Sequence, residues 1–205
     1  AVDLWAKAQN CAVLEPERIK RVSGALLAGQ TVRYWSAWPV AGEAPAGVER
    51  AETPEAADFA LTLTPEGGAL HLVPPIGVLG VGCRRGTTAE RLEEAFSAFC
   101  ASSGLSPAAV SAAASIDLKK EEPGLAQFCE AHGWPITFYT ADQLRAVPGQ
   151  FTPSAFVAGV TGVDNVCERA AAKASGGALL LPKTAGGGVT LALAVRPFAP
   201  DWRTE

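Results

Sequence analysis

The sequence contains no methionine, only two histidines and five cysteines in 205 residues. The missing methionine indicates either a piece of a longer protein or a first residue lost in processing. His71 and His132 are too few for a histidine-rich metal site, so we expect no metal centre. The cysteines are odd in number, and no pair has the short spacing of a zinc or redox motif. Free thiols in a cytoplasmic protein are therefore expected.

The sequence also lacks a long apolar run and an excess of positive charge. Its longest apolar stretch, residues 73–81, is interrupted by Pro74 and Pro75 and is shorter than the roughly 18 residues of a membrane span. The first residues, AVDLWAKAQN, have neither the basic start nor the apolar core of a signal peptide. A formal net charge of -4 argues against general nucleic-acid binding. We expect a soluble protein that binds neither membranes nor nucleic acids.

The chain divides into two halves, and the first, residues 1–72, is predicted to be a small α+β domain. Apolar residues at helical spacing predict a helix over 16–29, and β-branched and aromatic residues predict a strand over 31–38. Residues 41–57 are rich in Pro, Gly, Ala and Glu, which is typical of a loop. Two segments of alternating polarity flank the turn sequence PEGG and predict a β-hairpin over 58–74.

The second half, residues 73–205, alternates predicted strands with predicted helices. This pattern predicts an α/β domain with three layers, α/β/α. The run IGVLGV at 76–81 is continuously apolar, as in a strand buried on both faces. A closing hairpin over 178–197 makes the expected sheet mixed rather than wholly parallel. The other predicted elements are helices over 87–104, 106–115, 121–133, 141–147 and 163–177, and strands over 115–118 and 135–140.

The junction between the first of these strands and its helix carries the motif GVGCRRGTT. It is not a dinucleotide fingerprint, because Arg85 stands where the last glycine is needed, and RGTT lacks the lysine of a Walker loop. A strand end, a glycine-rich turn and a helix N-terminus still form a ready anion site. Arg84 and Arg85 add bidentate donors for a carboxylate or phosphate. From these residues alone, an anion-binding loop and a solvated turn both stay open.

Four segments of the second half resemble one known family. They are GVGCRRGTT, ASIDLKKEEPGL, TFYTADQL and GGALLLPKTAGGGVTLALA, in this order. Together they resemble the C-terminal domain of the cobalamin-biosynthesis protein G family (CbiG), which the CobE proteins share. In the first half, EPERIKRVSGALLAGQTV resembles the central region of the same family. The resemblance covers nearly the whole chain and implies a piece that lacks the family's N-terminal domain.

The resemblance implies a step of the anaerobic cobalamin (vitamin B12) pathway. Members of the family are cobalt-precorrin-5A hydrolases, which open the δ-lactone of the ring-contracted corrin intermediate and release acetaldehyde. The implied substrate carries many acetate and propionate carboxylates and brings its own cobalt, so no cofactor and no protein metal site are expected. Other enzymes of the pathway are the implied protein partners. The alternative is a non-catalytic corrinoid-binding or carrier module of the CobE type.

The loop Gly82–Thr87 is the expected substrate-binding element, placed at the carboxyl edge of the sheet to cradle a substrate carboxylate. Within it, Cys83 lies near a helix N-terminus and two cations, which lower a thiol pKa and suit a nucleophile. No histidine partner can be assigned to it, so a small residue packed at a tight turn is favoured. The expected substrate-binding residues are Gly82, Cys83, Arg84, Arg85, Gly86, Thr87 and Lys119.

Asp117 is the candidate catalytic residue. It follows a predicted strand, at the edge where ligands of α/β sheets usually bind. There its carboxylate suits a general base that directs water at the lactone carbonyl. The other interpretation is an acidic group near the N-terminus of the helix that starts at Pro123, which also explains Glu121 and Glu122. For Asp117 the two interpretations stay open.

Overall fold

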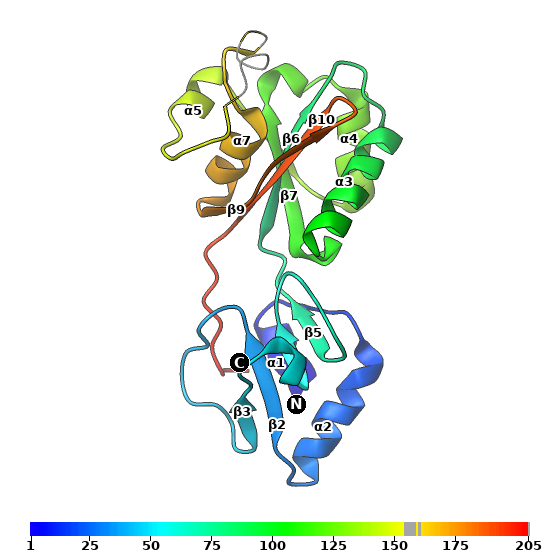
Figure 1. The fold of residues 1–205 in the computed structure, drawn as a ribbon, viewed down its shortest axis with the longest axis vertical. Helices are drawn as coiled ribbons and strands as arrows, with labels where there is room; N and C mark the ends of the chain where they lie inside the picture. The colour runs from blue at the N-terminus through cyan, green and yellow to red at the C-terminus, as the bar shows by residue number, and fades with distance from the viewer. Residues whose placement is uncertain (154–158, 160, 205) are drawn as a thin grey trace. The chain divides into compact units, whose positions relative to one another are not determined.

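The computed structural model describes residues 1–153, 159 and 161–204 (Figure 1). No helix in these ranges is long and apolar enough to cross a bilayer. All five cysteines are free thiols.

The chain forms two compact units, and each is assembled from more than one segment. The sequence prediction of two domains, 1–72 and 73–205, stays a prediction. Unit 1 takes Ala1–Pro75, Gly104–Ala109 and Phe198–Glu205, and unit 2 takes Ile76–Ser103 and Val110–Pro197.

Unit 1 is built on a five-stranded mixed sheet with the strand order β1-β5-β4-β2-β3. Strands β2 to β5 pair in parallel, and β1 pairs antiparallel with β5. The face that carries Tyr34, Phe59 and Leu70 is buried against Trp5 of the first helix. The elements are α1 (Val2–Ala8), β1 (Ala12–Val13), η1 (Pro16–Arg18), α2 (Ile19–Leu27), β2 (Val32–Ser36), β3 (Val48–Arg50), η2 (Pro54–Ala56), β4 (Phe59–Leu61), β5 (Leu70–Val73) and η3 (Pro107–Ala109).

The hairpin predicted over 58–74 is wrong, because β4 and β5 are parallel neighbours with Phe59 opposite Leu70. Alternating polarity predicts a strand and its buried face but carries no information on strand direction. The linking segment does not turn directly back. Its Leu63 is buried, and the Leu63 carbonyl accepts a hydrogen bond from the Ser106 N–H at 2.8 Å. The sequence prediction also missed α1 and β3.

The C-terminal segment completes the core of unit 1. The Trp202 ring stacks on Trp5, with 4.8 Å between ring centroids, and meets Tyr34 edge-on at 4.7 Å. The indole N–H of Trp5 donates to the Asp201 carbonyl at 2.6 Å. Residues from opposite ends of the sequence therefore share one apolar core.

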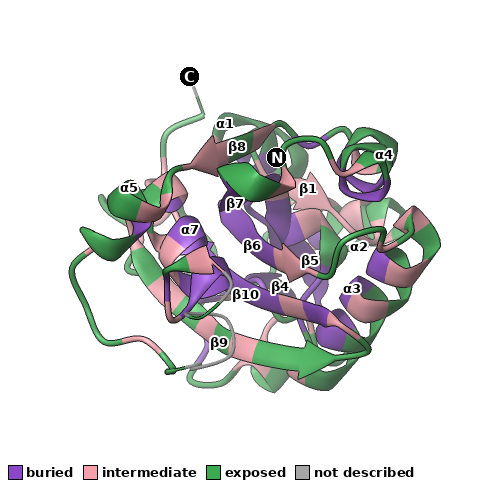
Figure 2. Ribbon diagram, turned by 90° about the horizontal axis from the view of Figure 1, so that it is seen from above, coloured by how far each residue is buried: buried purple, intermediate pink, exposed green. Residues whose placement is uncertain are grey.

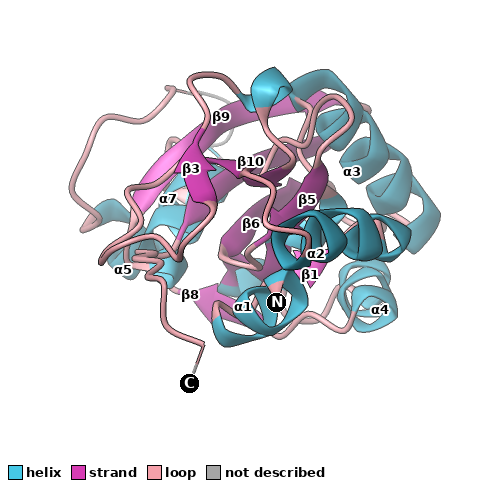
Figure 3. Cartoon of the chain, turned by 90° about the horizontal axis from the view of Figure 1, so that it is seen from below, coloured by secondary structure: helices cyan, strands magenta, loops and turns pink. Residues whose placement is uncertain are grey.

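Unit 2 has the predicted three layers around a mixed sheet, with the strand order β8-β7-β6-β10-β9. Strands β6, β7 and β8 are parallel, whereas β10 is antiparallel to β6 and β9 to β10. Helices α3 and α4 cover one face and α7 the other (Figures 1 and 3), and the central strands are buried (Figure 2). The elements are β6 (Gly77–Cys83), α3 (Ala89–Ser103), β7 (Val110–Ile116), η4 (Asp117–Lys119), α4 (Pro123–His132), β8 (Ile136–Tyr139), α5 (Ala141–Arg145), α7 (Val166–Ser175), β9 (Ala178–Gly186) and β10 (Val189–Val195).

The helix predicted over 106–115 is wrong, because strand β7 already begins at Val110. Alanine prefers a helix when local propensity decides. Here β7 lies between β6 and β8 and is buried along most of its length. Its alanines leave room for α7, which packs against β6, β7 and β10. Tertiary packing thus overrides the local preference.

Candidate functional site

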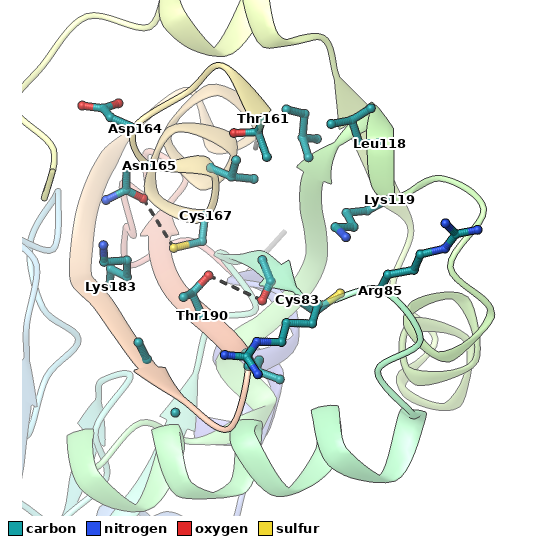
Figure 4. Close-up of a pocket in the computed structure, with 18 residues that line it drawn as sticks. Cys83, Arg85, Leu118, Lys119, Thr161, Asp164, Asn165, Cys167, Lys183 and Thr190 are labelled. Carbon is teal, nitrogen blue, oxygen red and sulfur yellow. Dashed lines mark hydrogen bonds between the residues drawn. The ribbon is translucent and has the colours of Figure 1, made fainter. Parts of the chain in front are cut away.

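A cavity of about 510 Å³ lies at the carboxyl ends of β6 and β7 (Figure 4). The start of α7 and the β9–β10 hairpin complete its wall. The chain leaves β6 over one face of the sheet through α3 and returns over the other face through α7, and α/β sheets bind ligands at such a change of direction. The lining residues are Gly82, Cys83, Arg84, Arg85, Ile116, Leu118, Lys119, Thr161, Asp164, Asn165, Val166, Cys167, Lys183, Ala185, Gly186, Gly188, Val189 and Thr190.

The charges of this lining are almost all positive. Arg84, Arg85, Lys119 and Lys183 contribute four cations, although the chain as a whole is acidic. Lys119 Nζ lies 3.8 Å from Glu122 Oε1. Within the described ranges, the other three cations have no carboxylate partner. The cavity therefore presents unpaired positive charge, which suits an anionic ligand.

Asp164 is the one acidic residue in the described part of the lining, and its carboxylate is already engaged. Arg169 Nε donates to Asp164 Oδ1 at 2.8 Å. This hydrogen bond, against a smaller effect of burial, holds the pKa of Asp164 below its usual value. In Figure 4 the Asp164 carboxylate points away from Cys167 and Thr190. Asp164 is thus ionised and bound to an arginine rather than aimed at a ligand.

Two glycines of the loop Gly82–Thr87 meet different steric demands. Gly82 lies opposite Thr190 across β6 and β10, and a Cβ at Gly82 would come within 2.3 Å of the Thr190 hydroxyl oxygen. Gly86 has a φ of +75°, in the left-handed region that favours glycine. The loop backbone is also fixed from both sides. The Arg84 N–H donates to the Gly188 carbonyl at 3.0 Å, and the Thr87 hydroxyl donates to the Arg84 carbonyl at 2.7 Å.

The carboxylate that this loop binds belongs to the chain itself. The Gly86 N–H donates to Glu122 Oε2 at 2.9 Å. The first turn of α3 is capped by Thr88, whose hydroxyl accepts from the Arg91 N–H at 3.1 Å. Gly82, Cys83, Arg84, Arg85 and Lys119 line the cavity as a set, but Gly86 and Thr87 do not. The anion-binding role of the loop stays a prediction, and Glu122 of the chain itself occupies its Gly86 end.

Two family models cover this chain almost from end to end. The model described as "Cobalamin synthesis G C-terminus" matches residues 77–194, which is more than half of the chain. The model described as "Cobalamin biosynthesis central region" matches residues 1–73. The chain belongs to the cobalamin synthesis G family. The resemblance stated from the sequence motifs is confirmed.

Curated relatives carry two different names. A cobalt-precorrin-5A hydrolase of Priestia megaterium is 35% identical over 134 residues, which are 65% of this chain and 35% of the relative. Protein CobE of Sinorhizobium sp is 33% identical over 120 residues, 57% of this chain and 78% of the relative. The chain therefore spans about a third of the hydrolase that it matches.

A solved structure matches unit 2 in size. The crystal structure of CobE, a protein from the cobalamin (vitamin B12) biosynthetic pathway, superposes with a TM-score of 0.54 at 34% sequence identity. The match covers 60% of this chain and 92% of the CobE chain. The three-layer α/β fold is therefore shared with a family relative of known structure.

Asp117 lies outside the cavity in this member of the cobalamin synthesis G family. It starts η4, directly after β7, and its side chain is exposed. Its neighbours Ile116, Leu118 and Lys119 line the cavity, but Asp117 does not. Its role as a general base stays a prediction, and the geometry adds nothing to it.

The two thiols of the cavity are poor nucleophiles. Burial raises the pKa of Cys83, against the opposing effect of Lys119. Burial likewise raises the pKa of Cys167 to about 12, although a hydrogen bond with Thr190 opposes the shift. Both thiols are therefore protonated at neutral pH, and thiolates are the reactive form. This agrees with packing at a tight turn for Cys83.

No group of three or more His, Cys, Asp or Glu side chains in the described part of the chain is arranged to hold a metal ion.

Sequence analysis missed the part of the site that comes from α7 and β9. Asn165 is the N-cap of α7, where its side chain accepts from the Glu168 N–H at 3.0 Å. An Asp-Asn pair before a helix is a recognisable start signal, so Asn165 was within reach of sequence reasoning. Lys183 follows a proline in an apolar strand, and no sequence pattern indicates that it faces the same cavity as Arg84.

Proposed function

We propose that this chain binds the carboxylates of a cobalt-corrinoid substrate and acts as part of a cobalt-precorrin-5A hydrolase in cobalamin biosynthesis. The reaction opens the δ-lactone of the substrate and releases acetaldehyde. The observation that carries the proposal is the cavity of unit 2, in which Arg84, Arg85 and Lys183 have no carboxylate partner among the described residues. Membership of the family and the hydrolase name of the relatives supply the substrate.

The lining chemistry suits an amphipathic macrocycle with acidic side arms. A volume of about 510 Å³ lies within the usual range for small-molecule sites. Ile116, Val166 and Val189 supply apolar surface, and the cations surround it. Leu118 is a lining residue with 60% of its surface exposed, a large apolar side chain left for a ligand to cover. Charge-assisted bonds to the side-arm carboxylates would then fix the orientation of the ring.

The residues of the cavity support binding and charge stabilisation better than proton abstraction. Opening a lactone needs water to attack the carbonyl carbon, and negative charge develops on the carbonyl oxygen. Lys119, Lys183 and the arginines are suited to stabilise that charge. Among the lining residues that the structure describes, the only acid is Asp164, which is bonded to Arg169. The described residues that line the cavity therefore support substrate binding and electrostatic stabilisation, and they do not include an oriented general base.

A second function, a non-catalytic corrinoid-binding module of the CobE type, has one observation in its favour. The match to the CobE structure covers 92% of that chain, so unit 2 corresponds to a protein that exists without the rest of the hydrolase. Both functions require binding of the corrinoid, but only the hydrolase converts it and releases acetaldehyde. We expect the chain by itself to bind the substrate and to release acetaldehyde slowly.

The experiment combines binding and turnover on the purified chain. Cobalt-precorrin-5A is titrated while the corrin absorbance is followed, and acetaldehyde is assayed in the same samples. The double variant Arg84→Ala/Arg85→Ala should bind at least about tenfold more weakly, because two charge-assisted bonds are lost. Lys20→Ala/Arg50→Ala removes the same charge from exposed positions of unit 1 and should bind as the parent does.

Each outcome of this experiment separates the proposals. Equal binding by the parent and the Arg84→Ala/Arg85→Ala variant at moderate salt would show that the loop is only a turn. Acetaldehyde formation at the rate of an intact cobalt-precorrin-5A hydrolase would establish the chain as a complete catalyst. Binding with no acetaldehyde at all favours the CobE-type module.

A further inference from the structure

Strand β9 contains a β-bulge at the point where Lys183 reaches the cavity. Thr184 pairs with Leu191 and Leu181 pairs with Leu193, so Pro182 and Lys183 together lie opposite the single residue Ala192. Proline has no N–H to donate to a strand ladder, and bulges are common next to functional sites, where they re-aim a side chain. Strand β9, at the edge of the sheet, is therefore bent locally at Lys183, one of the cations that line the cavity.

A buried carboxylate of α7 holds this bulge. Glu168 is only 1% exposed, and its Oε1 accepts from the Lys183 N–H at 2.7 Å. The Thr152 hydroxyl donates to the same oxygen at 2.9 Å, and the Thr152 N–H donates to Oε2 at 2.9 Å. In the first turn of α7 the helix dipole favours this negative charge. The Glu168 carboxylate therefore connects α7, strand β9 and the segment at Thr152. The binding chemistry proposed above gives it no role.

Lys183 has the properties of a ligand-binding cation rather than of a structural one. Its side chain lines the cavity, and in the described part of the chain its ammonium has no hydrogen bond and no ion pair. The Lys183 charge is close enough to oppose the upward shift of the Cys167 pKa. The backbone of Lys183 is therefore fixed while its charged end is left unpartnered.

We propose that Lys183 binds a carboxylate of the substrate and that Glu168 is its positioning residue, acting through the Pro182–Lys183 bulge. This inference rests on the proposed function and assigns one of its contacts. Among the described residues, Glu168 accepts from the Thr152 N–H, the Thr152 hydroxyl and the Lys183 N–H, and it forms no ion pair with the Lys183 ammonium. It fixes the strand from which Lys183 projects, and the charge stays available to an anion.

The amide isostere separates positioning from packing. In Glu168→Gln the shape is kept, but one carboxylate oxygen becomes an NH2 donor. If the amide oxygen faces the Lys183 N–H, the NH2 opposes the Thr152 N–H, and in the flipped orientation the NH2 opposes Lys183. One of the contacts is lost in either case: α7 loses its bond to the Thr152 backbone in the first orientation and its bond to the Pro182–Lys183 bulge in the second.

The experiment measures the affinity for two stable probes by absorbance titration: cobyrinic acid, a corrinoid with free carboxylates, and its heptamethyl ester, which has none. Lys183→Ala should bind the acid about tenfold more weakly, and Lys183→Arg should recover most of the loss. Binding of the ester should not change. Lys173→Ala, an exposed lysine of α7 removed from the cavity lining, is the matched control and should bind as the parent does.

Glu168 is tested by a double-mutant cycle with the same probes. Glu168→Gln should weaken binding of the acid, and Glu168→Gln/Lys183→Ala should be no weaker than Lys183→Ala alone, because both changes remove one interaction. In the parent chain, hydrogen exchange at the Lys183 amide should be slow although β9 is an edge strand. This measurement needs no variant and covers the case in which Glu168→Gln fails to fold.

Several results would overturn the inference. Unchanged acid binding in Lys183→Ala refutes the contact. Additive losses in the double variant, or weaker binding of the ester in Glu168→Gln, show that Glu168 only supports the fold. Fast hydrogen exchange at the Lys183 amide would show that Glu168 does not hold the Pro182–Lys183 bulge. If the parent binds neither probe, the proposed function itself is wrong and the inference falls with it.

Discussion

At the scale of single residues, Gly80 decides how closely α7 approaches the sheet. A Cβ at Gly80 would lie 1.8 Å from the Cys167 carbonyl oxygen, which belongs to helix backbone and cannot rotate aside. The first turn of α7, including Cys167, is part of the cavity wall. A glycine in the middle of β6 therefore sets both the packing of unit 2 and the shape of its site.

We expect Gly80→Ala to lower the free energy of unfolding of unit 2 by at least about 3 kcal/mol, because the whole helix must move to admit one methyl group. Gly24→Ala is the control, and we expect it to change stability in the opposite direction. Gly24 is an exposed position of α2 where an added Cβ would meet no atom within 4 Å, and alanine there should stabilise unit 1 by about 0.5–1 kcal/mol. Denaturant unfolding followed by circular dichroism measures both changes. A Gly80→Ala protein as stable as the parent would mean that α7 is not packed on β6 as described.

At the scale of secondary-structure elements, the starts of α3 and α4 share one carboxylate. Gly124, in the first turn of α4, has no room for a Cβ, since the Thr87 carbonyl oxygen would lie 2.0 Å away. Glu122 is the N-cap of α4, and its side chain reaches the Gly86 N–H just before α3. The same carboxylate is the partner of Lys119, a cation of the cavity. Glu122 therefore holds the loop in place and also weakens the positive charge available to a ligand.

Removing the Glu122 charge while keeping its shape should strengthen the binding of a polycarboxylate. In Glu122→Gln the amide oxygen still accepts from Gly86, but Lys119 loses its partner, so we expect about threefold tighter binding of cobyrinic acid. Glu121→Gln removes an equal charge at the adjacent exposed position and should have a smaller effect. Titration at two salt concentrations distinguishes the two variants. Weaker binding by Glu122→Gln would show that an anchored loop matters more than a free Lys119.

The sequence predicts elements well where local chemistry decides them. The strand at 77–83, the helix after it and the closing hairpin are confirmed, because apolar runs, caps and turn glycines are local signals. Strand direction at β4 and β5 and the alanine-rich strand β7 were mispredicted, since long-range packing decides both. The motif GVGCRRGTT predicted a binding role for Arg84 and Arg85, and both residues line the cavity. No motif predicted Lys183, because its placement depends on a bulge and on a contact with Glu168, which join residues that lie apart in sequence.

At the scale of the whole molecule, we expect the stability of unit 1 to depend on pH through a buried histidine and its carboxylate partner. In unit 1, His71 is 2% exposed and both of its ring nitrogens face acceptors: Glu15 Oε1 at 2.8 Å and the Glu66 carbonyl at 2.9 Å. Glu15 Oε2 also accepts from the His71 N–H at 2.8 Å. Although burial opposes it, these bonds and the charge of His71 hold the pKa of Glu15 below its ordinary value of 4.5.

A carboxylate with a depressed pKa stabilises the fold above its unfolded pKa, and the contribution is lost as the pH falls through the folded pKa. Unit 1 should therefore lose stability below about pH 4.5. Four of the five tryptophans lie in unit 1, so tryptophan fluorescence during thermal unfolding reports mainly on this unit. We expect Glu15→Gln to be less stable than the parent at pH 7 and to lose less stability between pH 5 and pH 3. Glu17→Gln, an exposed acid of η1, should keep the parent's pH dependence. If Glu15→Gln and the parent lose stability in parallel, the acid sensitivity of unit 1 comes from other carboxylates and the His71–Glu15 pair contributes none of it.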